Sequence, residues 1–329
     1  MHKLSPLSKV VKLAVLSGLA CSSVSTQVFA ADEDTAEKDI EKIAIVGSRA
    51  APRSVGDSAV PIDIISSEEF NQQGSTDMVS MLQTVVPSFN VNEQPINDAS
   101  TLVRPANLRG MASDHTLVLV NGKRRHRSAV ITFLGGGLSD GAQGPDLSVI
   151  PSVAIKQVEV LRDGAAAQYG SDALAGVINF ALKNDNEGGM LEAKYGSYYE
   201  GDGDTVQVSG NVGLPIGDDG FVNLSFESRT ADPTSRSVQR DDAQALIDAG
   251  NSHVANPAQV WGNPEVKDDS KFFANFGLDI NEDTQAYMFA NYATREVEGG
   301  FYFRNPHNRG GVNDGGIEPA DIDGNGTIE

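Results

Sequence analysis

The feature that most constrains the fold is a series of long segments in which apolar and polar residues alternate. They follow Lys183, and the clearest is residues 205–214, Thr-Val-Gln-Val-Ser-Gly-Asn-Val-Gly-Leu. Successive side chains of a strand point to opposite faces, so this pattern predicts strands with one apolar and one polar face. Comparable alternation occurs at residues 191–195, 222–226, 272–280 and 286–293.

The connections between these segments also alternate, between short and long. Short turns are expected at 215–220 and 281–284, and longer connections at 200–204, at 231–269 and beyond Glu298. Outer-membrane barrels have short periplasmic turns and longer outer loops, and their strands are about this long. A soluble sandwich rarely places so long a loop between consecutive strands. Residues 186–329 are therefore predicted to start an antiparallel transmembrane β-barrel.

The first thirty residues have the features of a secretory signal peptide. Lysines precede and enter an apolar run from Val10 to Ala20, and Val28-Phe29-Ala30 provides a small-residue cleavage site before Ala31. The run is shorter than the roughly 20 apolar residues of a spanning helix. We expect export, with cleavage after Ala30.

Cysteine content and charge narrow the class of protein further. Cys21, the only cysteine, lies within residues 1–30, where a lipoprotein cleavage site is the alternative interpretation. The mature protein then has no disulfide bonds, which requires a core, a barrel or a partner to stabilise it. The net charge of −20 argues against nucleic acid as a partner.

Residues 31–52 are predicted to be a flexible segment that contains one β-prone run. The acidic stretch 31–39 has nothing to bury, and residues 41–49, Glu-Lys-Ile-Ala-Ile-Val-Gly-Ser-Arg, follow it. We interpret this run as an unpaired strand that can add to the sheet edge of another protein. The alternative is that it forms the first strand of the next domain.

Residues 53–185 have the mixed pattern of an α+β domain. A strand at 61–65 precedes a helix that starts within residues 66–70 with a hydroxyl cap and acids in its first turn. A second helix carries Met78 and Met81 and ends at Pro87. Methionines at this helical spacing indicate core packing rather than metal binding.

Two further strands are expected at 102–109 and 116–120, as a pair separated by a turn. Asn121-Gly122 then predicts a tight hairpin. The basic cluster Lys123, Arg124, Arg125, His126 and Arg127 comes directly after this turn. Such a cluster is either a solvated loop or a contact for an anionic ligand.

Residues 155–180 pack strand, turn and small-residue signals closely together. Strands are expected around Val158 and from Val177 to Leu182, and between them lie several alanines and three glycines, Gly164, Gly170 and Gly176. Small side chains let backbones approach each other, so this stretch is predicted to lie in a crowded interior.

Two weaker motifs suggest other chemistry. Residues 137–141 match the nucleophile elbow around Ser139 but lack the strand and helix that an elbow needs, so a flexible loop is preferred to a serine hydrolase. Asp321, Asp323 and Asn325 occupy calcium-loop positions, but the closing acid is absent, so an acidic loop is preferred to a metal site. No cofactor is expected.

Four motifs together resemble the TonB-dependent outer-membrane receptors. Residues 43–47 (Ile43, Ala44, Ile45, Val46, Gly47) resemble the TonB box, and 61–89 resemble the opening strand and helices of the plug. Residues 108–110 with 117–122 resemble its central sheet. The stretch 158–179 resembles the most recognisable signature of the plug.

The resemblance implies a plug that fills a barrel of about 22 strands and is pulled by TonB. It assigns Arg109, Glu159 and Arg162 to a latch between plug and barrel. It also places ligand contacts on two outward loops, 91–104 and 123–144, which include Arg104 and the basic cluster. About five barrel strands are found, so the sequence is expected to be an amino-terminal part of the receptor.

The expected function is active import, without enzymatic activity, across the outer membrane of a Gram-negative cell. Iron chelates, haem, cobalamin and oligosaccharides are the solutes that the resemblance implies. A passive porin or a surface adhesin with a structural amino-terminal domain is the alternative. Dependence on the ion gradient distinguishes the receptor from a porin or adhesin, because only the receptor takes its energy through TonB.

Overall fold

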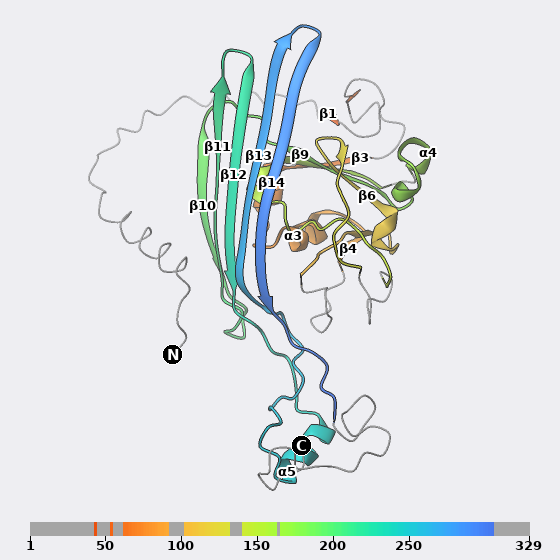
Figure 1. Ribbon diagram of the computed structural model, residues 1–329, viewed down its shortest axis with the longest axis vertical. Helices are drawn as coiled ribbons and strands as arrows, with labels where there is room; N and C mark the ends of the chain where they lie inside the picture. Colours follow the sequence, from red (N-terminus) through yellow and green to blue (C-terminus); the bar gives the residue numbers. More distant parts are fainter. Residues whose placement is uncertain are drawn as a thin grey trace, which may run out of the picture. The chain divides into compact units, whose positions relative to one another are not determined.

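Two five-stranded sheets form the framework of the described chain (Figure 1). The computed structural model describes residues 43–44, 53–54, 62–91, 102–131, 140–162 and 165–305. They belong to one unit of the chain, Lys42–Glu329. We call residues 62–182 the plug, and we call strands β10–β14 (residues 189–298) the wall.

The plug contains a mixed sheet, as the sequence predicts. Its strands in spatial order are β3 (Ile62–Ser66), β8 (Ile155–Leu161), β9 (Gly176–Leu182), β6 (Thr116–Val120) and β7 (Lys123–Arg124). Strands β6 and β9 are parallel, and the other neighbours are antiparallel. The Asn121-Gly122 hairpin joins β6 to β7 and confirms that prediction, with both residues at positive φ.

Two short helices cover this sheet, and each begins at a side-chain cap. The Ser66 hydroxyl accepts a hydrogen bond from Glu69 N at 3.2 Å at the start of α2 (Ser67–Asn71). A carboxylate oxygen of Asp77 accepts one from Ser80 N at 3.1 Å at the start of α3 (Met78–Val85). Met78 and Met81 are buried, which confirms their interpretation as core residues.

The remaining elements are short. They are β1 (Ile43–Ala44), β2 (Arg53–Ser54), β4 (Phe89–Asn90), β5 (Asn107–Leu108), the 3-10 turns η2 (Ser113–His115), η4 (Ser152–Ala154) and η5 (Ser171–Ala173), and the helices α4 (Ala166–Tyr169) and α5 (Asp241–Asp248). No helix among the described residues is long and apolar enough to cross a membrane.

Two strand predictions are wrong. Only residues 107–108 of the predicted strand 102–109 are extended, and they pair with β4 rather than with β6. Pro105 lacks a backbone N–H and cannot donate within a ladder, which explains the interruption. The run at Ile43 is also not unpaired, because β1 pairs with β2 through Ile43–Ser54 and Ala44–Arg53.

The wall is an antiparallel sheet in which each strand pairs with the next along the chain. Its strands are β10 (Gly189–Gly196), β11 (Thr205–Ile216), β12 (Gly220–Ala231), β13 (Glu265–Asn281) and β14 (Thr284–Glu298). Short turns at 217–219 and 282–283 lie at one end, and the long connections 197–204 and 232–264 lie at the other. The predicted rhythm of short and long connections is confirmed.

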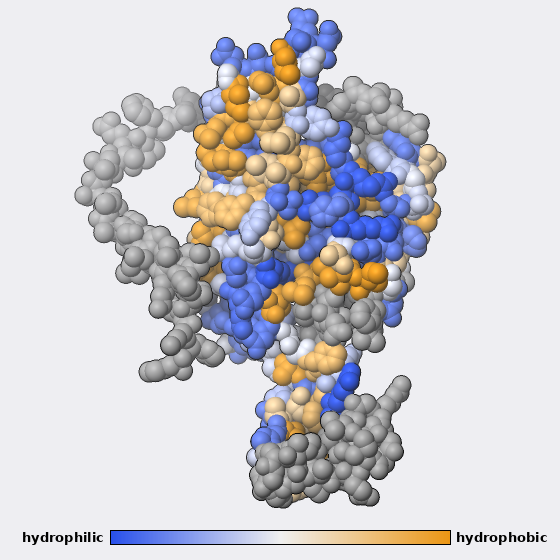
Figure 2. Space-filling view, viewed as in Figure 1, coloured by the Kyte–Doolittle hydropathy of each residue, from blue (hydrophilic) through white to orange (hydrophobic). Residues whose placement is uncertain are grey.

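The two faces of the wall differ in polarity, in the reverse of a soluble protein. The face that packs on the plug buries polar side chains such as Gln207, Ser209 and Asn223. The opposite face exposes large apolar side chains. Leu191, Val206, Val212, Leu214, Leu224, Phe272, Ile280, Met288 and Tyr292 are among them. Figure 2 shows hydrophobic side chains over the strands and hydrophilic ones at the short turns.

The crowded interior predicted for residues 155–180 yields the first testable prediction. Gly176 has φ +145°, and a Cβ there would lie 2.3 Å from Leu161 O and 2.7 Å from Leu108 Cδ2. Gly176→Ala should therefore lower the free energy of opening of the plug sheet by about 2 to 4 kcal/mol. Native-state hydrogen exchange at the Ile178 amide measures this change.

Gly74→Ala provides the matched control, because a Cβ at Gly74 meets nothing within 4 Å. Exchange at Ile178 should be unchanged in that variant. Equal exchange in the two variants would contradict the close approach of β8 and β9.

Candidate functional site

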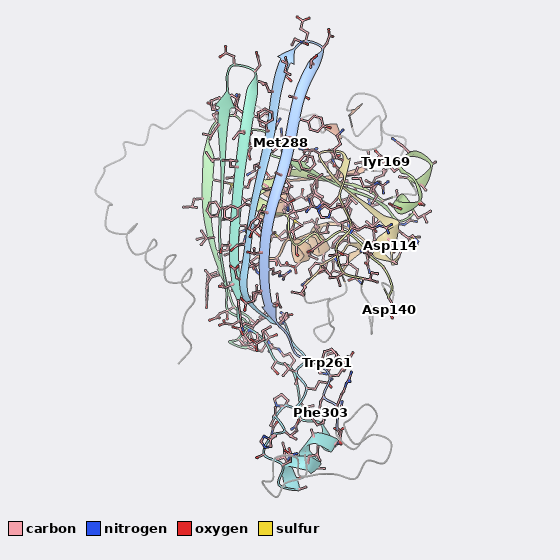
Figure 3. All side chains as sticks on the ribbon, viewed as in Figure 1. Asp114, Asp140, Tyr169, Trp261, Met288 and Phe303 are labelled. Carbon is pink, nitrogen blue, oxygen red and sulfur yellow. The ribbon has the colours of Figure 1, made fainter. Side chains whose placement is uncertain are left out.

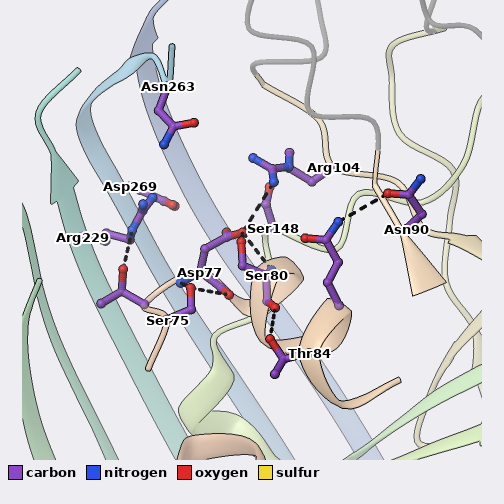
Figure 4. A network of polar contacts seen from close by, with 12 residues as sticks. Ser75, Asp77, Ser80, Thr84, Asn90, Arg104, Ser148, Arg229, Asn263 and Asp269 are labelled. Atoms are coloured by element: carbon purple, nitrogen blue, oxygen red, sulfur yellow. Dashed lines mark hydrogen bonds and ion pairs between the residues drawn. The ribbon is translucent and has the colours of Figure 1, made fainter. Parts of the chain in front are cut away.

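A polar cavity of about 400 Å³ lies between the plug and the wall, toward the long connections. The plug contributes residues 74–77, Ser80 and Arg104. The wall and its connections contribute Arg229, Asp232, Asn263 and Arg295, among others. Figure 4 shows how side chains of the two parts meet in this region, and Figure 3 shows Trp261 and Phe303 among the connections beyond it.

On the plug side, the start of α3 and Arg104 form one polar unit. A carboxylate oxygen of Asp77 accepts hydrogen bonds from both Ser80 N and Ser80 Oγ, and lies 3.6 Å from an Arg104 Nη. Burial raises the pKa of Asp77, but Arg104, Arg229 and the Ser80 hydrogen bond outweigh it, so the net pKa is below 3.8. Asp77 is therefore held as a carboxylate.

On the wall side, a row of polar residues crosses all five strands at one level. Strand pairing brings Lys194 beside Gln207, Gln207 beside Arg229, Arg229 beside Asp269, and Asp269 beside Arg295. We call these five residues the charged row. Arg229 Nε donates to the Thr76 hydroxyl of the plug at 3.3 Å, so the row also contacts the plug.

One step toward the short turns, a buried ion pair within the wall is hydrogen-bonded to the plug. Lys271 Nζ lies 2.7 Å from Glu227 Oε1, and both side chains are almost fully buried. The other carboxylate oxygen of Glu227 accepts hydrogen bonds from Ser152 N at 3.0 Å and Ser152 Oγ at 2.9 Å. Since Ser152 begins η4, the turn that directly precedes β8, this contact holds the start of that strand against the wall.

A third set of contacts, made by amides, lies closer to the short turns. Asn275 Nδ2 donates to Lys183 O at 2.9 Å, and Asn275 Oδ1 accepts from Asn121 Nδ2 at 3.2 Å. Arg125 Nη1 donates to Asn291 Oδ1 at 2.9 Å. Phe273 of β13 adds an apolar contact by joining the core of the plug. The plug therefore contacts the wall along the length of the sheet.

The predicted latch residues have contacts within the plug. Arg162 pairs with Asp63 at 2.5 Å, and the Glu159 carboxylate accepts hydrogen bonds from Asn179 at 3.0 Å and Gln157 at 2.7 Å. Arg109 has φ 57° and lies just after β5. The latch role of these three residues stays a prediction, while Glu227, Lys271 and Ser152 make the buried contact between plug and wall.

The residues predicted to face a ligand lie in different places. Arg104 lines the cavity. Lys123 lies over the ring of Tyr287, near the short turn at 282–283, and Arg124 pairs with Asp172 within the plug. Arg125 is buried against the wall rather than solvated. His126 and Arg127 are exposed.

Several sequence predictions lie outside the described residues. They are the signal peptide, Ile45 to Gly47 of the predicted TonB box, Ser139, and the calcium candidates Asp321, Asp323 and Asn325. Among the residues that are described, no group of three or more His, Cys, Asp or Glu side chains is placed to hold a metal ion.

Sequence reasoning missed the charged row and the Glu227–Lys271 pair. The sequence did contain a sign of these contacts. Charged residues stand at polar-face positions of the alternating strands, where small polar residues would be enough to keep that face polar: Arg229, Asp269, Lys271 and Arg295. Their meeting depends on the strand register and on the docking of the plug. Neither can be obtained from alternation alone.

The first prediction from this site concerns the buried pair. Glu227→Ala should destabilise the docked plug by about 3 to 5 kcal/mol, because Lys271 would remain buried without this carboxylate. The thermal unfolding midpoint of the purified protein should fall accordingly. The matched control is Glu298→Ala, which removes the partner of Lys267 in an exposed pair and should leave the midpoint unchanged. Similar midpoints for both variants would refute the anchoring role.

A second prediction concerns pH. Because the folded-state pKa of Asp77 lies below 3.8, ionised Asp77 stabilises α3 above pH 3.8, and this stabilisation is lost as the pH falls through the folded pKa. Asp77→Asn keeps a capping oxygen but loses the charge, and should ease the opening of α3 by about 1 kcal/mol at pH 7.

Hydrogen exchange at the Leu82 amide, corrected for the intrinsic rate, measures this opening at each pH. The wild-type protein and Asp77→Asn should become equal at low pH. A difference that stays constant or grows on acidification would contradict the ion pair with Arg104.

Comparisons with known proteins agree with this architecture. Residues 54–177 match the family model of the TonB-dependent Receptor Plug Domain. The chain is 26% identical over 221 residues to the vitamin B12 transporter BtuB of Photobacterium profundum, covering 67% of this chain and 32% of that protein. It is 28% identical over 296 residues to the probable TonB-dependent siderophore receptor PirA of Acinetobacter baumannii, covering 76% and 38%.

Solved structures show the same fold. A point mutant of the ferric enterobactin receptor PfeA of Pseudomonas aeruginosa, in complex with enterobactin, superposes with a TM-score of 0.52 at 17% identity, over 73% of this chain and 34% of that one. The chain spans about a third of the length of the curated relatives. Residues 54–177 therefore match the plug domain of TonB-dependent receptors, and the antiparallel strands that follow resemble in fold the start of such a receptor's barrel.

Proposed function

We propose that the protein imports a scarce solute across the outer membrane of a Gram-negative cell, with energy supplied by TonB. The observation that carries this proposal is the reversed polarity of the wall. Its apolar face suits lipid, and its polar face is occupied by the plug. A docked plug blocks passive flow, so transport needs work to move it.

The names of the relatives support import rather than an enzymatic reaction. Those reported above are by name a vitamin B12 transporter and a probable siderophore receptor. We therefore propose a cobalamin or an iron chelate as the solute class to test first, and no enzymatic activity. The signal peptide, with cleavage after Ala30, would deliver the chain to the outer membrane.

The orientation follows from the connections. Short turns of outer-membrane barrels face the periplasm and long ones face outward. The cavity with Arg104, Arg229 and Arg295 would then receive the solute from outside. Lys123 and Arg124 would lie toward the periplasm, because Lys123 contacts Tyr287 near a short turn. We therefore propose that Lys123 and Arg124 do not face the solute.

Residues 43–47 are proposed to be the segment that TonB binds. A β-prone segment binds a partner by adding a strand, through main-chain hydrogen bonds. Ile43 and Ala44 pair with Arg53 and Ser54, so strand addition by TonB would replace or extend a short existing ladder. The pull would then be transmitted to β3 at residue 62.

Deleting residues 43–47 tests the energy coupling. Uptake of labelled solute by cells that express the variant should fall to background, while binding at the cell surface stays at the wild-type level. The pull would no longer reach the plug, but the cavity would be intact. Parallel assays of uptake and surface binding measure the two outcomes.

The matched control deletes five residues of the acidic tether, 33–37, and should preserve uptake. Retained uptake in the 43–47 variant would reject the TonB assignment. Uptake that is insensitive to an uncoupler would favour the passive porin or adhesin.

A further inference from the structure

A second, much smaller polar cavity lies inside the plug and shares no lining residue with the cavity between plug and wall. Its volume is about 40 Å³, and it is surrounded by η2, the start of β6, the segment after β7 and residues 143–145. Asp114, labelled in Figure 3, is one of its lining residues. One water molecule needs roughly 10 to 15 Å³. The cavity therefore admits a few waters or one small ion, and it excludes a metabolite.

Three polar atoms of the lining residues have no hydrogen-bond partner among the described residues. They are Ser113 Oγ, Thr116 Oγ1 and Arg125 Nε. The three residues are only 1%, 2% and 8% exposed. A buried polar group without a partner is costly, and nearly all such groups in folded proteins are bonded to protein, water or an ion. Three of them around one cavity indicate a bound species that accepts hydrogen bonds.

The local fold brings these three residues to one place. Thr116 N donates to Ser113 O and closes the 3-10 turn η2, in which residues three apart lie on the same side. Thr116 and Val118 share one face of β6, because alternate residues of a strand do so. Arg125 N donates to Val118 O at 2.9 Å, which holds Arg125 beside this strand. The backbone therefore positions the donors before any ligand binds.

Residues 143–145 close the cavity from the other side. A Cβ at Gly144 would lie 2.6 Å from Ser113 Cβ and 2.7 Å from Ser113 Oγ, so the backbone there packs directly on Ser113. Gln143 N donates to Asp114 Oδ1 at 2.9 Å, and Ser128 N donates to Gly144 O at 3.1 Å. These hydrogen bonds hold the closing segment in place.

The charge of Arg125 is only partly balanced by the protein. Its Nη1 donates to the neutral Asn291 Oδ1, and the carboxylate that acts on it, Asp146, forms no ion pair with it among the described residues. Burial lowers the pKa of Arg125, and Asp146 offsets this only in part. Asp146 Oδ1 already accepts hydrogen bonds from Arg104 N, Ser148 N and Ser148 Oγ. An anion next to Arg125 Nε would stabilise the buried guanidinium further.

We propose that this cavity binds one halide ion, in practice chloride, through the Ser113 and Thr116 hydroxyls and Arg125 Nε–H. An anion accepts hydrogen bonds from all three donors at once, whereas a metal cation does not, because a guanidinium can only donate. Three arginines and two aspartates line the cavity, so one negative charge balances them: Arg124, Arg125, Arg127, Asp114 and Asp172. The inference goes beyond the proposed import and does not depend on it.

The bound ion would also strengthen the docking of the plug. Arg125 Nη1 donates to Asn291 Oδ1 of β14 at 2.9 Å, and an ion on Nε of the same planar group fixes its orientation. An ion that binds the folded protein alone raises its stability with concentration, up to saturation of the site. Chloride should therefore raise the thermal unfolding midpoint of the protein.

The direct test is anomalous diffraction from crystals of the purified protein grown in sodium bromide. Bromide scatters anomalously and replaces chloride at halide sites. The expected result is an anomalous difference peak inside the cavity, in contact with Ser113 Oγ, Thr116 Oγ1 and Arg125 Nε. This measurement uses the wild-type protein, so it does not depend on the folding of any variant.

The second test follows the unfolding midpoint in detergent while sodium chloride replaces sodium gluconate at constant ionic strength. Gluconate is too large for a cavity of about 40 Å³. The midpoint of the wild-type protein should rise and then level off. Ser113→Ala combined with Thr116→Val keeps the shape of the cavity but removes two donors. The chloride concentration for half of the effect should then rise by about tenfold or more.

The matched control is Thr84→Val, which removes an exposed plug hydroxyl that donates to Ser80 O and lies outside the cavity. Its response to chloride should equal that of the wild type. Two results would overturn the inference. One is a cavity that shows ordered water and no bromide peak. The other is the same chloride response in the double variant as in Thr84→Val.

Discussion

The structure depends on how the polar side chains on the plug-facing side of the wall obtain hydrogen-bond and ion-pair partners. A β-sheet with an apolar face toward lipid must turn its other side chains inward, and buried polar groups are costly without partners. Glu227 illustrates how this cost is met. Its carboxylate forms an ion pair with Lys271 of the wall and accepts two hydrogen bonds from Ser152 of the plug. The plug thus completes the wall, and the wall in turn positions the plug.

This reciprocal arrangement bears on the transport proposed above, because the same contacts hold the plug and would have to be exchanged to move it. The polar contacts described between plug and wall are hydrogen bonds, and Phe273 adds an apolar contact. Polar contacts between two pre-folded surfaces can be exchanged for contacts with water when the plug is pulled, whereas an exposed apolar core would be far more costly. The charged row lies at the end of the wall with the long connections, where the proposed function would have a solute enter.

The sequence was sufficient for those features that depend on local pattern. Alternation predicted the strands of the wall and their two faces, and capping chemistry predicted the helix after Ser66. Contacts that depend on register were not predicted. The pairing of β5 with β4, the row through Arg229 and Asp269, and the docking of Ser152 on Glu227 each join residues far apart in the chain. A charged residue on the polar face of an alternating strand indicates that a contact forms there, but it does not identify the partner residue.

The central claim is that the two faces of the wall meet different environments, one lipid and one plug. Spin labels placed singly at residues 205–214 of the bilayer-reconstituted protein test it directly, through collision with oxygen dissolved in the lipid. The account predicts high oxygen accessibility at Val206, Val212 and Leu214 and low accessibility at Gln207, Ser209 and Asn211. Uniform accessibility along the strand, or the opposite alternation, would contradict it.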